Sequence, residues 1–226
     1  MNTSLVNWIL VLFVSFSWGA SFMFTRLAVD EIAPTYLVVA RLFLASILLG
    51  PIFIRKKDLI LMSKEIPSIL ILGIINAALP FFLYAYAAQD LSAGMLSILN
   101  GTSPLFALII AITWFKQNTT VMQIFGLGLG FMGLLVFIGI DQISFIFYPV
   151  LLCLIGAFCY AYSNNILFKL NHIRSAALAS VTMISGFFFS LPLLLMEPAE
   201  FSLDLSLQII FAIFFLGLVS TGISFI

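Results

Sequence analysis

Two asparagines each stand four residues before a proline inside an apolar stretch, Asn76 before Pro80 and Asn100 before Pro104. Proline has no N–H to donate, so in a helix it leaves the carbonyl four residues earlier without its usual partner. Each pair predicts a free carbonyl beside an amide side chain, near the middle of a bilayer core of about 30 Å. We predict that both asparagines bind a substrate and that both prolines act as hinges. The alternative is that the amides only hydrogen-bond between helices and the prolines only kink them.

Arg41 is the one basic residue well inside an apolar stretch, and Trp18 comes at a similar depth in the preceding stretch. A guanidinium can stack on an aromatic ring and can bind a carboxylate or phosphate through two parallel hydrogen bonds. We predict that Arg41 and Trp18 belong to the substrate site, with the guanidinium against the indole. The alternatives are that the Arg41 side chain extends to the membrane surface or braces helix packing.

Tyrosine and asparagine recur in later apolar stretches, as Tyr84 and as Tyr160 followed by Asn164. Apolar walls with a few polar groups aimed inward are typical of a cavity for an amphipathic metabolite. These three residues are therefore added to the predicted substrate-binding set. Most of the 25 phenylalanines are expected to face lipid or other helices.

Other patterns give no sign of catalysis or of a cofactor. Gly128, Gly130 and Gly133 spell the GxGxxG of dinucleotide sites, but they lie within an apolar stretch that no strand precedes. Gly126, Gly130 and Gly133 are instead expected to form a small-residue seam for close helix packing. The single histidine, His172, falls in a loop, and no apolar stretch contains two carboxylates. Neither an enzyme, a metal site nor a cofactor is predicted.

Composition defines the elements that must position these residues. Of the 226 residues, 63% are apolar and 8% are charged, with no net charge, whereas a soluble domain carries about 25% charged residues. A soluble domain is therefore excluded, the lipid bilayer is the expected surrounding, and nucleic acid finds no electrostatic attraction. The pattern predicts an all-α polytopic membrane protein with eight transmembrane helices, at about 5–25, 34–54, 67–87, 92–114, 120–139, 145–167, 175–196 and 207–226.

The loops between these stretches differ in charge. Every second loop is basic, and together these loops hold seven of the nine Lys and Arg residues: Arg55, Lys56, Lys57, Lys64, Lys116, Lys169 and Arg174. The positive-inside rule makes this side cytoplasmic, and with it the N-terminus. The acidic residues expected on the opposite side are Asp30, Glu31, Asp90, Asp141, Glu197, Glu200 and Asp204.

A weak internal repeat divides the chain. A shift of 141 residues places Trp18-Gly19-Ala20 over Cys159-Tyr160-Ala161, and a shift of 144 places Leu72-Gly73 over Leu216-Gly217. A repeat unit of five helices crosses the membrane an odd number of times. Its second copy therefore starts on the opposite side and is inverted relative to the first. We predict a first five-helix repeat over 1–140 and a partial second repeat of three helices over 145–226. About 57 residues of the second copy are then absent, and we expect a truncated form of a ten-helix (5+5) inverted repeat.

Several short segments carry a family resemblance. Trp18-Gly19-Ala20-Ser21-Phe22, Ala40-Arg41-Leu42-Phe43 and Ser103-Pro104-Leu105-Phe106 resemble the first EamA-type half of the drug/metabolite transporter superfamily. The resemblance implies ten helices in two inverted halves, a central substrate cavity between them, and transport of small metabolites.

These observations predict a secondary transporter of the bacterial inner membrane. We expect it to export small metabolites such as amino acids by alternating access. The alternatives are a non-transporting truncated fragment, a membrane subunit that requires a partner chain, and a passive facilitator. A homodimer is also left open.

Overall fold

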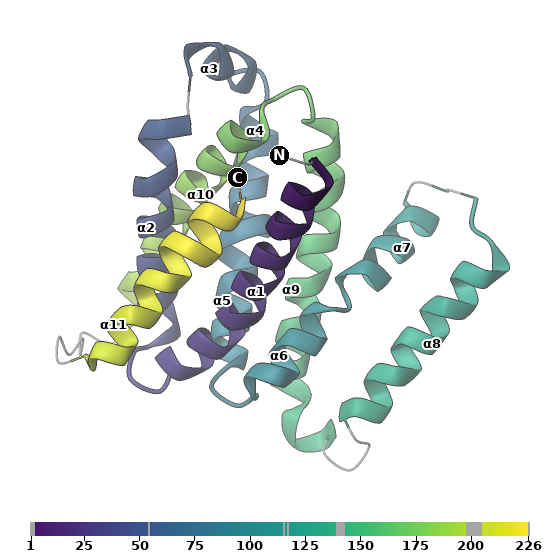
Figure 1. Cartoon of the computed structure of the whole chain (residues 1–226). Helices are drawn as coiled ribbons and strands as arrows, with labels where there is room; N and C mark the ends of the chain where they lie inside the picture. Colours follow the sequence, from purple (N-terminus) through teal and green to yellow (C-terminus); the bar gives the residue numbers. More distant parts are fainter. Residues whose placement is uncertain are drawn as a thin grey trace.

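The structure, a computed structural model, describes residues 3–53, 55–114, 116, 118–138, 143–197 and 205–225. All regular elements in these ranges are helices, and they run up and down between two ends of the molecule (Figure 1). The predicted all-α fold is therefore confirmed. Among the described residues, six helical segments are long and apolar enough to cross a membrane: Leu5–Ala28, Ile66–Ala87, Ala93–Thr113, Ile146–Lys169, Ser175–Leu195 and Leu207–Phe225.

Two further predicted spans coincide with shorter apolar helices, Pro34–Gly50 and Val121–Leu134. The count of eight transmembrane helices therefore stays a prediction. The first part of the chain consists of α1 (Thr3–Ala28), α2 (Pro34–Phe53), α3 (Lys56–Met62), α4 (Ile66–Leu72), the π-helix η1 (Gly73–Ala78), α5 (Leu79–Ala87), α6 (Ala93–Asn100), α7 (Ser103–Thr113) and α8 (Val121–Ile138). The second part consists of α9 (Ile143–Lys169), α10 (Ser175–Ser190), the 3₁₀-helix η3 (Leu191–Met196), α11 (Leu207–Phe214), the π-helix η4 (Phe215–Gly222) and the 3₁₀-helix η5 (Ile223–Phe225).

Two of the long apolar segments are interrupted near a proline. Pro80 follows the π-helix η1, where the Leu79 N–H donates to the Ile74 carbonyl, five residues earlier. A π-turn of this kind is the wider hydrogen-bonding pattern that a helix adopts when its regular ladder is broken. Pro104 lies at the start of α7, directly after the break at Gly101 and Thr102 that separates α6 from α7. Both prolines thus mark a change of helix geometry, and their role as hinges stays a prediction.

The centre of the molecule is the contact between α2 and α10. The buried Ser180 hydroxyl of α10 lies 3.1 Å from the Leu49 carbonyl oxygen of α2. Leu42, Leu49 and Met183 are fully buried in this region. Apolar contact and one interhelical hydrogen bond therefore hold these two helices together.

Two further crossings depend on glycine. Where η1 crosses α10, a Cβ atom on Gly73 would lie 2.9 Å from the Gly186 backbone nitrogen. Where η4 crosses α2, a Cβ atom on Gly217 would lie 2.6 Å from Leu44 Cβ. Both distances are shorter than van der Waals contact, so only glycine allows the backbones to approach this closely.

The glycines of α8 do not form the predicted seam. A Cβ atom on Gly126 or Gly133 would have open space around it, and only Gly130 meets a neighbour, Leu105, at 2.8 Å. The reason is that α8 packs along α6 and α7 and lies at the side of the bundle (Figure 1). Its large side chains, among them Phe125 at 62% exposure, face outward. The seam prediction is wrong for Gly126 and Gly133 because a small-residue pattern does not say whether a second helix lies beside it.

The basic loops gather at one end of the molecule. The short helix α3 and the connection between α9 and α10 lie at this end, together with the start of α1 (Figure 1). Arg174 donates a 2.7 Å hydrogen bond to Asp58, and this bond lowers the pKa of the Asp58 carboxyl. Apolar side chains of both connections pack beneath it: Met62, Ile69, Leu72, Leu170, Ile173, Ala177 and Leu178.

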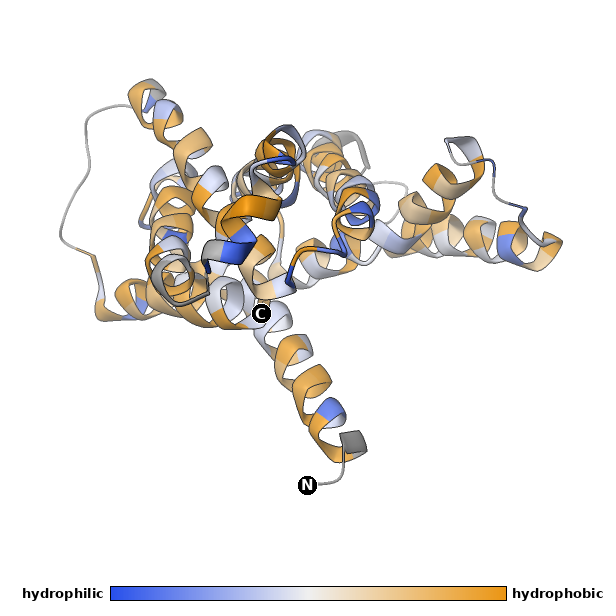
Figure 2. Cartoon of the chain, turned by 90° about the horizontal axis from the view of Figure 1, so that it is seen from above, coloured by the Kyte–Doolittle hydropathy of each residue, from blue (hydrophilic) through white to orange (hydrophobic). Residues whose placement is uncertain are grey.

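The acidic residues predicted for the opposite side, where they are described, lie at the other end. Glu31 accepts hydrogen bonds from the Ser206 hydroxyl and backbone N–H, which joins the α1–α2 turn to the start of α11. Asp30 pairs with Arg26 at the end of α1. Asp141, Glu200 and Asp204 lie outside the described residues. Seen along the helices, most outward-facing ribbon is apolar, as expected of a protein surrounded by lipid (Figure 2).

Candidate functional site

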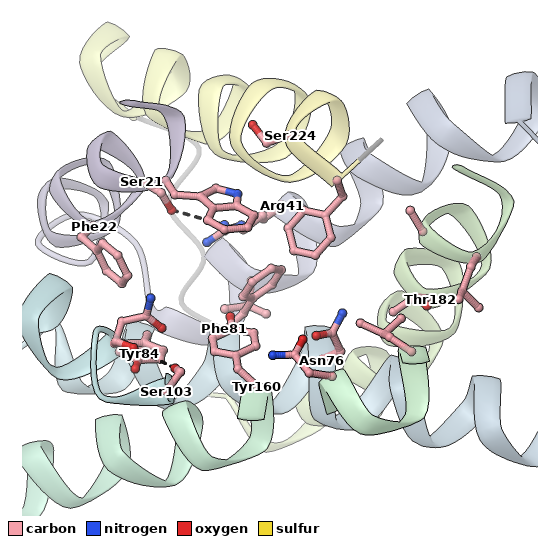
Figure 3. A pocket seen from close by; sticks show the side chains of 18 of the residues that line it. Ser21, Phe22, Arg41, Asn76, Phe81, Tyr84, Ser103, Tyr160, Thr182 and Ser224 are labelled. Carbon is pink, nitrogen blue, oxygen red and sulfur yellow. Dashed lines mark hydrogen bonds between the residues drawn. The ribbon is translucent and has the colours of Figure 1, made fainter. Parts of the chain in front are cut away.

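A cavity of about 780 Å³ lies among the helices. Its walls come from α1, α2, the η1–α5 segment, the α6–α7 break, α9, α10 and η5 (Figure 3). The predicted substrate-binding residues that line it are Trp18, Arg41, Asn76, Tyr84, Asn100, Tyr160 and Asn164. Pro104 lines it too, whereas Pro80 does not. The structure thus brings together side chains that are up to 146 residues apart in sequence, Trp18 and Asn164.

Arg41 is buried on the cavity wall, with 9% of its surface exposed. Its Nε donates to the Thr221 hydroxyl at 2.6 Å, and its Nη2 lies 3.3 Å from the hydroxyls of Ser21 and Ser220. The guanidinium carbon lies 3.9 Å from the centre of the Phe81 ring. The alternative that Arg41 extends to the membrane surface is therefore wrong, because hydroxyls inside the bundle take its hydrogen bonds.

The aromatic partner of Arg41 differs from the predicted one. Phe81, one turn after η1, lies beneath the guanidinium, whereas the Trp18 ring packs against Phe225 with 5.9 Å between centroids. Trp18 and Arg41 both line the cavity, as depth along their helices suggested. The depth of a residue does not tell how its helix is rotated about its own axis. This rotation determines which aromatic ring the guanidinium contacts.

Asn76 holds two helices together at the edge of the cavity. Its amide oxygen accepts a 2.8 Å hydrogen bond from the Ser163 hydroxyl of α9, which is fully buried. The interhelical hydrogen bond considered as an alternative is therefore present. The same side chain lines the cavity, and its role in substrate binding stays a prediction.

Asn100 ends α6 at the break in the fourth apolar segment. Its backbone carbonyl is not free, because the Ser103 hydroxyl donates to it at 2.7 Å. The prediction of a free carbonyl is thus wrong here: a serine three residues later replaces the missing N–H. The side-chain oxygen of Asn100 is buried and has no hydrogen-bond partner among the described residues. It is a polar acceptor on the cavity wall that a ligand could satisfy.

The tyrosines form one side of the cavity. Tyr84 and Tyr160 stack with 6.4 Å between ring centroids, and the Tyr84 hydroxyl donates a 3.1 Å hydrogen bond to the Cys153 carbonyl. A Cβ atom on Gly156 would lie 2.8 Å from the Tyr84 ring, so the missing side chain makes room for it. Asn164 follows one turn after Tyr160 and is exposed to the cavity.

The cavity reaches one end of the molecule and stops before the other. Its lining includes Leu170, Asn171, Ile173 and Ser175, all in or beside the connection between α9 and α10. Toward the opposite end the described lining stops at Thr25, Leu37 and Ala85.

A cluster of hydrogen bonds lies at this opposite end of the molecule, beyond the last residues that line the cavity. The Glu197 carboxylate accepts hydrogen bonds from the Thr35 hydroxyl and, at 3.0 Å, from the Tyr86 hydroxyl. Thr35 opens α2, Tyr86 lies in the last turn of α5, and Glu197 follows η3. Three separate segments are thereby tied together below the cavity.

Some lining residues were not predicted from the sequence, among them Ser21, Phe22, Thr182 and Phe225. One signal would have found the first of these. Ser17, Ser21 and Thr25 recur every four residues along α1, and all three are buried. A line of small hydroxyls at helical spacing in an apolar helix marks the face that meets the protein interior.

The fold and the cavity together define an integral membrane protein with an internal cavity. Residues 7–139 match the family model described as the EamA-like transporter family. The chain belongs to this family, which confirms the resemblance found in its sequence. No solved structure gives a significant match.

Similar proteins are named as transporters. "Uncharacterized transporter YoaV" of Bacillus subtilis is 25% identical over 96% of this chain and 76% of its own length. An "Uncharacterized transporter" of Archaeoglobus fulgidus is 26% identical over 95% of this chain and 76% of its own length. An "S-adenosylmethionine/S-adenosylhomocysteine transporter" of Chlamydia muridarum is 25% identical over 79% of this chain and 58% of its own length. The family and these relatives are transporters, which confirms that the chain is not an enzyme.

Proposed function

We propose that the chain is a secondary transporter that exports small metabolites such as amino acids across the bacterial inner membrane. The observation that carries this proposal is the 780 Å³ cavity, lined by asparagines, serines and one arginine inside otherwise apolar helices. Polar groups are costly in a membrane interior, so their convergence on one cavity favours a substrate site. We propose Trp18, Arg41, Asn76, Tyr84, Asn100, Tyr160 and Asn164 as the substrate-binding residues.

The mechanism we propose is alternating access between two inverted halves, 1–140 and 145–226. Its support is the reciprocal packing of the two π-helices. In one half η1 packs against α10 at Gly73, and in the other η4 packs against α2 at Gly217. A shift of 144 residues relates these two glycines, and a shift of 141 residues relates the start of α2 to the start of α10. Inverted repeats that exchange contacts in this way are typical of secondary transporters.

The two ends of the cavity give the proposal a direction. If the N-terminus is cytoplasmic, as the positive-inside rule predicts, the cavity reaches the cytoplasmic end near Ser175. The cluster of Thr35, Tyr86 and Glu197 then closes the outer end. We propose that this is the inward-facing state and that Pro80 and Pro104 act as hinges when the outer end opens.

The test is solute counterflow in proteoliposomes that contain only the purified chain. The labelled solutes are a mixture of L-amino acids and S-adenosylmethionine, the latter because a relative carries that substrate in its name. We expect at least one solute to exchange, and we expect Asn100→Ala to slow that exchange about tenfold through loss of an aimed polar contact. Asn7→Ala, on the exposed part of α1, is the matched control.

Vesicles of known orientation separate export from import. Exchange that is fastest from the side of the α9–α10 connection supports export. If the folded chain moves no solute in any orientation, the proposal fails and the chain is a non-transporting fragment or a subunit that requires a partner chain.

A further inference from the structure

Arg41 is the one charged residue among the described residues that line the cavity. The two ion pairs in the described part of the chain are Arg26 with Asp30 and Arg174 with Asp58, and both lie away from it. A charged group inside a membrane protein normally faces a counter-charge, because water does not solvate it there. Within the described part of the chain, the charge of Arg41 is met by neutral groups alone.

The hydrogen bonds of Arg41 leave part of the guanidinium unused. Nε and Nη2 donate to the hydroxyls of Thr221, Ser21 and Ser220. Nη1 donates no hydrogen bond within the described ranges, although a guanidinium carries two N–H groups there. Hydroxyl dipoles and the face of Phe81 orient the group but supply no negative charge. An anion in the cavity would satisfy both the charge and the free N–H groups.

We propose that Arg41 binds the carboxylate of the transported molecule, so that the substrates of this cavity are small monocarboxylates with an apolar or aromatic body. The proposal rests on the transport function proposed above. It assigns the charge of the substrate and one atom group that the cavity recognises.

The charge balance of the cavity favours a carboxylate over other groups. A phosphate monoester carries about −1.5 to −2 charges at neutral pH, which one guanidinium leaves partly uncompensated. A purely cationic molecule would meet Arg41 and no carboxylate, because Asp and Glu are absent from the described lining. A monocarboxylate brings one negative charge to one positive charge and matches the planar fork of the guanidinium.

The rest of the lining suits the body of such a molecule. Aromatic rings from four segments surround the space beside Arg41 (Figure 3), and they belong to Trp18, Phe22, Phe81, Tyr84, Tyr160 and Phe225. Rings of this kind bury apolar surface and carry no charge of their own. The cavity therefore combines one cationic contact with an apolar container, which is the complement of an amphipathic monocarboxylate.

A purely structural role is the competing explanation. Arg41 joins α2 to α1 and η4 through its three hydroxyl contacts, and this role alone would stabilise the bundle without any ligand. The two explanations differ in one measurable respect. If Arg41 only stabilises helix packing, the cavity has no preference between a carboxylate and a neutral molecule of the same shape. If Arg41 binds the substrate, the cavity prefers the carboxylate.

The experiment compares 3-phenylpropionate with 3-phenylpropanamide, which have the same body and differ in charge. Binding to the purified, detergent-solubilised chain is measured by calorimetry at neutral pH, with inorganic phosphate as a third probe. We expect the carboxylate to bind about tenfold or more tightly than the amide, the range of a charge-assisted hydrogen bond. Phosphate is expected to compete weakly.

Variants assign the preference to Arg41. Arg41→Gln should abolish it, and Arg41→Lys should keep part of it because a lysine retains the charge and loses the fork. Arg26→Gln, in an ion pair outside the cavity, is the matched control and should keep the full preference. The wild-type comparison needs no variant, so it decides the matter even if an Arg41 variant fails to fold.

Equal binding of the carboxylate and the amide by the wild type would overturn the proposal, as would an Arg41→Gln variant that keeps the preference. Stronger binding of phosphate than of the carboxylate would overturn the monoanion assignment. Failure of the transport function looks different: the carboxylate then binds with the expected preference, but no solute exchanges across proteoliposomes. Transport of the amide as fast as the carboxylate would uphold transport and overturn this inference.

Discussion

Gly217 in η4 lies so close to Arg41 in α2 that a Cβ atom on this glycine would come within 3.2 Å of the Arg41 carbonyl oxygen. The same atom would lie 2.6 Å from Leu44 Cβ. Backbone and Cβ atoms cannot rotate away as the tip of a long side chain can. The position of the cationic group in the cavity therefore depends on a residue that has no side chain.

Gly217→Ala is expected to force α2 and η4 apart. The cost should be about 1–3 kcal/mol in the free energy of unfolding, as for other overpacked sites. The measurement is the melting temperature of the detergent-purified chain, followed by circular dichroism. Gly133→Ala is the control, because its Cβ atom would meet open space and alanine favours a helix over glycine. Equal losses in both variants would show that the crossing at Gly217 is not tight.

Ser163→Ala should weaken the contact between α9 and η1. It removes the one hydrogen-bond partner of the Asn76 amide oxygen that the described residues provide. Hydrogen bonds between membrane helices contribute about 0.6 kcal/mol on average and up to about 1.7 kcal/mol, so we expect a loss in that range. Melting temperatures of this variant and of Ser97→Ala, at an exposed position of α6, check it. No difference between the two would contradict the expectation.

The bond between Asp58 and Arg174 should make stability depend on pH. The pKa of Asp58 is lowered in the folded chain, chiefly by the hydrogen bond from Arg174. Its contribution is therefore fully present above the unfolded pKa of about 3.9 and is lost as the pH falls through the lower, folded pKa. Melting curves from pH 7 to pH 2 should show Asp58→Asn less stable than wild type at neutral pH, with the gap closing below about pH 4.

Asp30→Asn is the control for this pH series. Asp30 also pairs with an arginine, but its side chain is 60% exposed against 9% for Asp58, and exposed ion pairs contribute little. We expect its melting temperature to follow wild type over the whole range. A gap for Asp58→Asn that stays constant with pH would exclude the ionised carboxylate as its cause.

Loss of Glu197 should open the end of the molecule that is closed below the cavity. Glu197→Ala removes the carboxylate that accepts from Thr35 and Tyr86, and so it releases the end of η3 from α2 and α5. With Ala85→Cys as a reporter on the cavity wall, and with the buried Cys153 and Cys159 replaced, we expect a membrane-impermeant maleimide to react several-fold faster from that side. Asp30→Ala, at the same end but outside the cluster, should leave the rate unchanged. An unchanged rate in Glu197→Ala would mean that other contacts close this end.

Position along each helix was predictable from the sequence, and rotation about each helix was not. Counting residues from the ends of the apolar stretches placed Asn76, Asn100 and Arg41 at comparable depth, and all three line one cavity. Counting residues did not predict that Phe81, and not Trp18, lies under the Arg41 guanidinium. Which side of a helix faces inward depends on its neighbours, and apolar residues on all sides of these helices hide that information.

Two local expectations failed because a nearby residue changed the outcome. Ser103 takes the Asn100 carbonyl that Pro104 leaves without a partner, and a hydroxyl three residues away is easily overlooked in a proline argument. The glycines of α8 were expected to pack because glycines of this spacing often do. Only Gly130 has a neighbour, Leu105, since α8 lies at the side of the bundle beside α6 and α7.

The two glycine crossings also limit how the halves can move. At Gly73 against Gly186 and at Gly217 against α2, the absence of a Cβ atom lets the helices approach so closely that little space is left between them. Two such points define a line, and turning about that line is the one rigid motion that leaves both intact. We therefore expect the line through these two crossings to be the rotation axis of the proposed movement between the two halves.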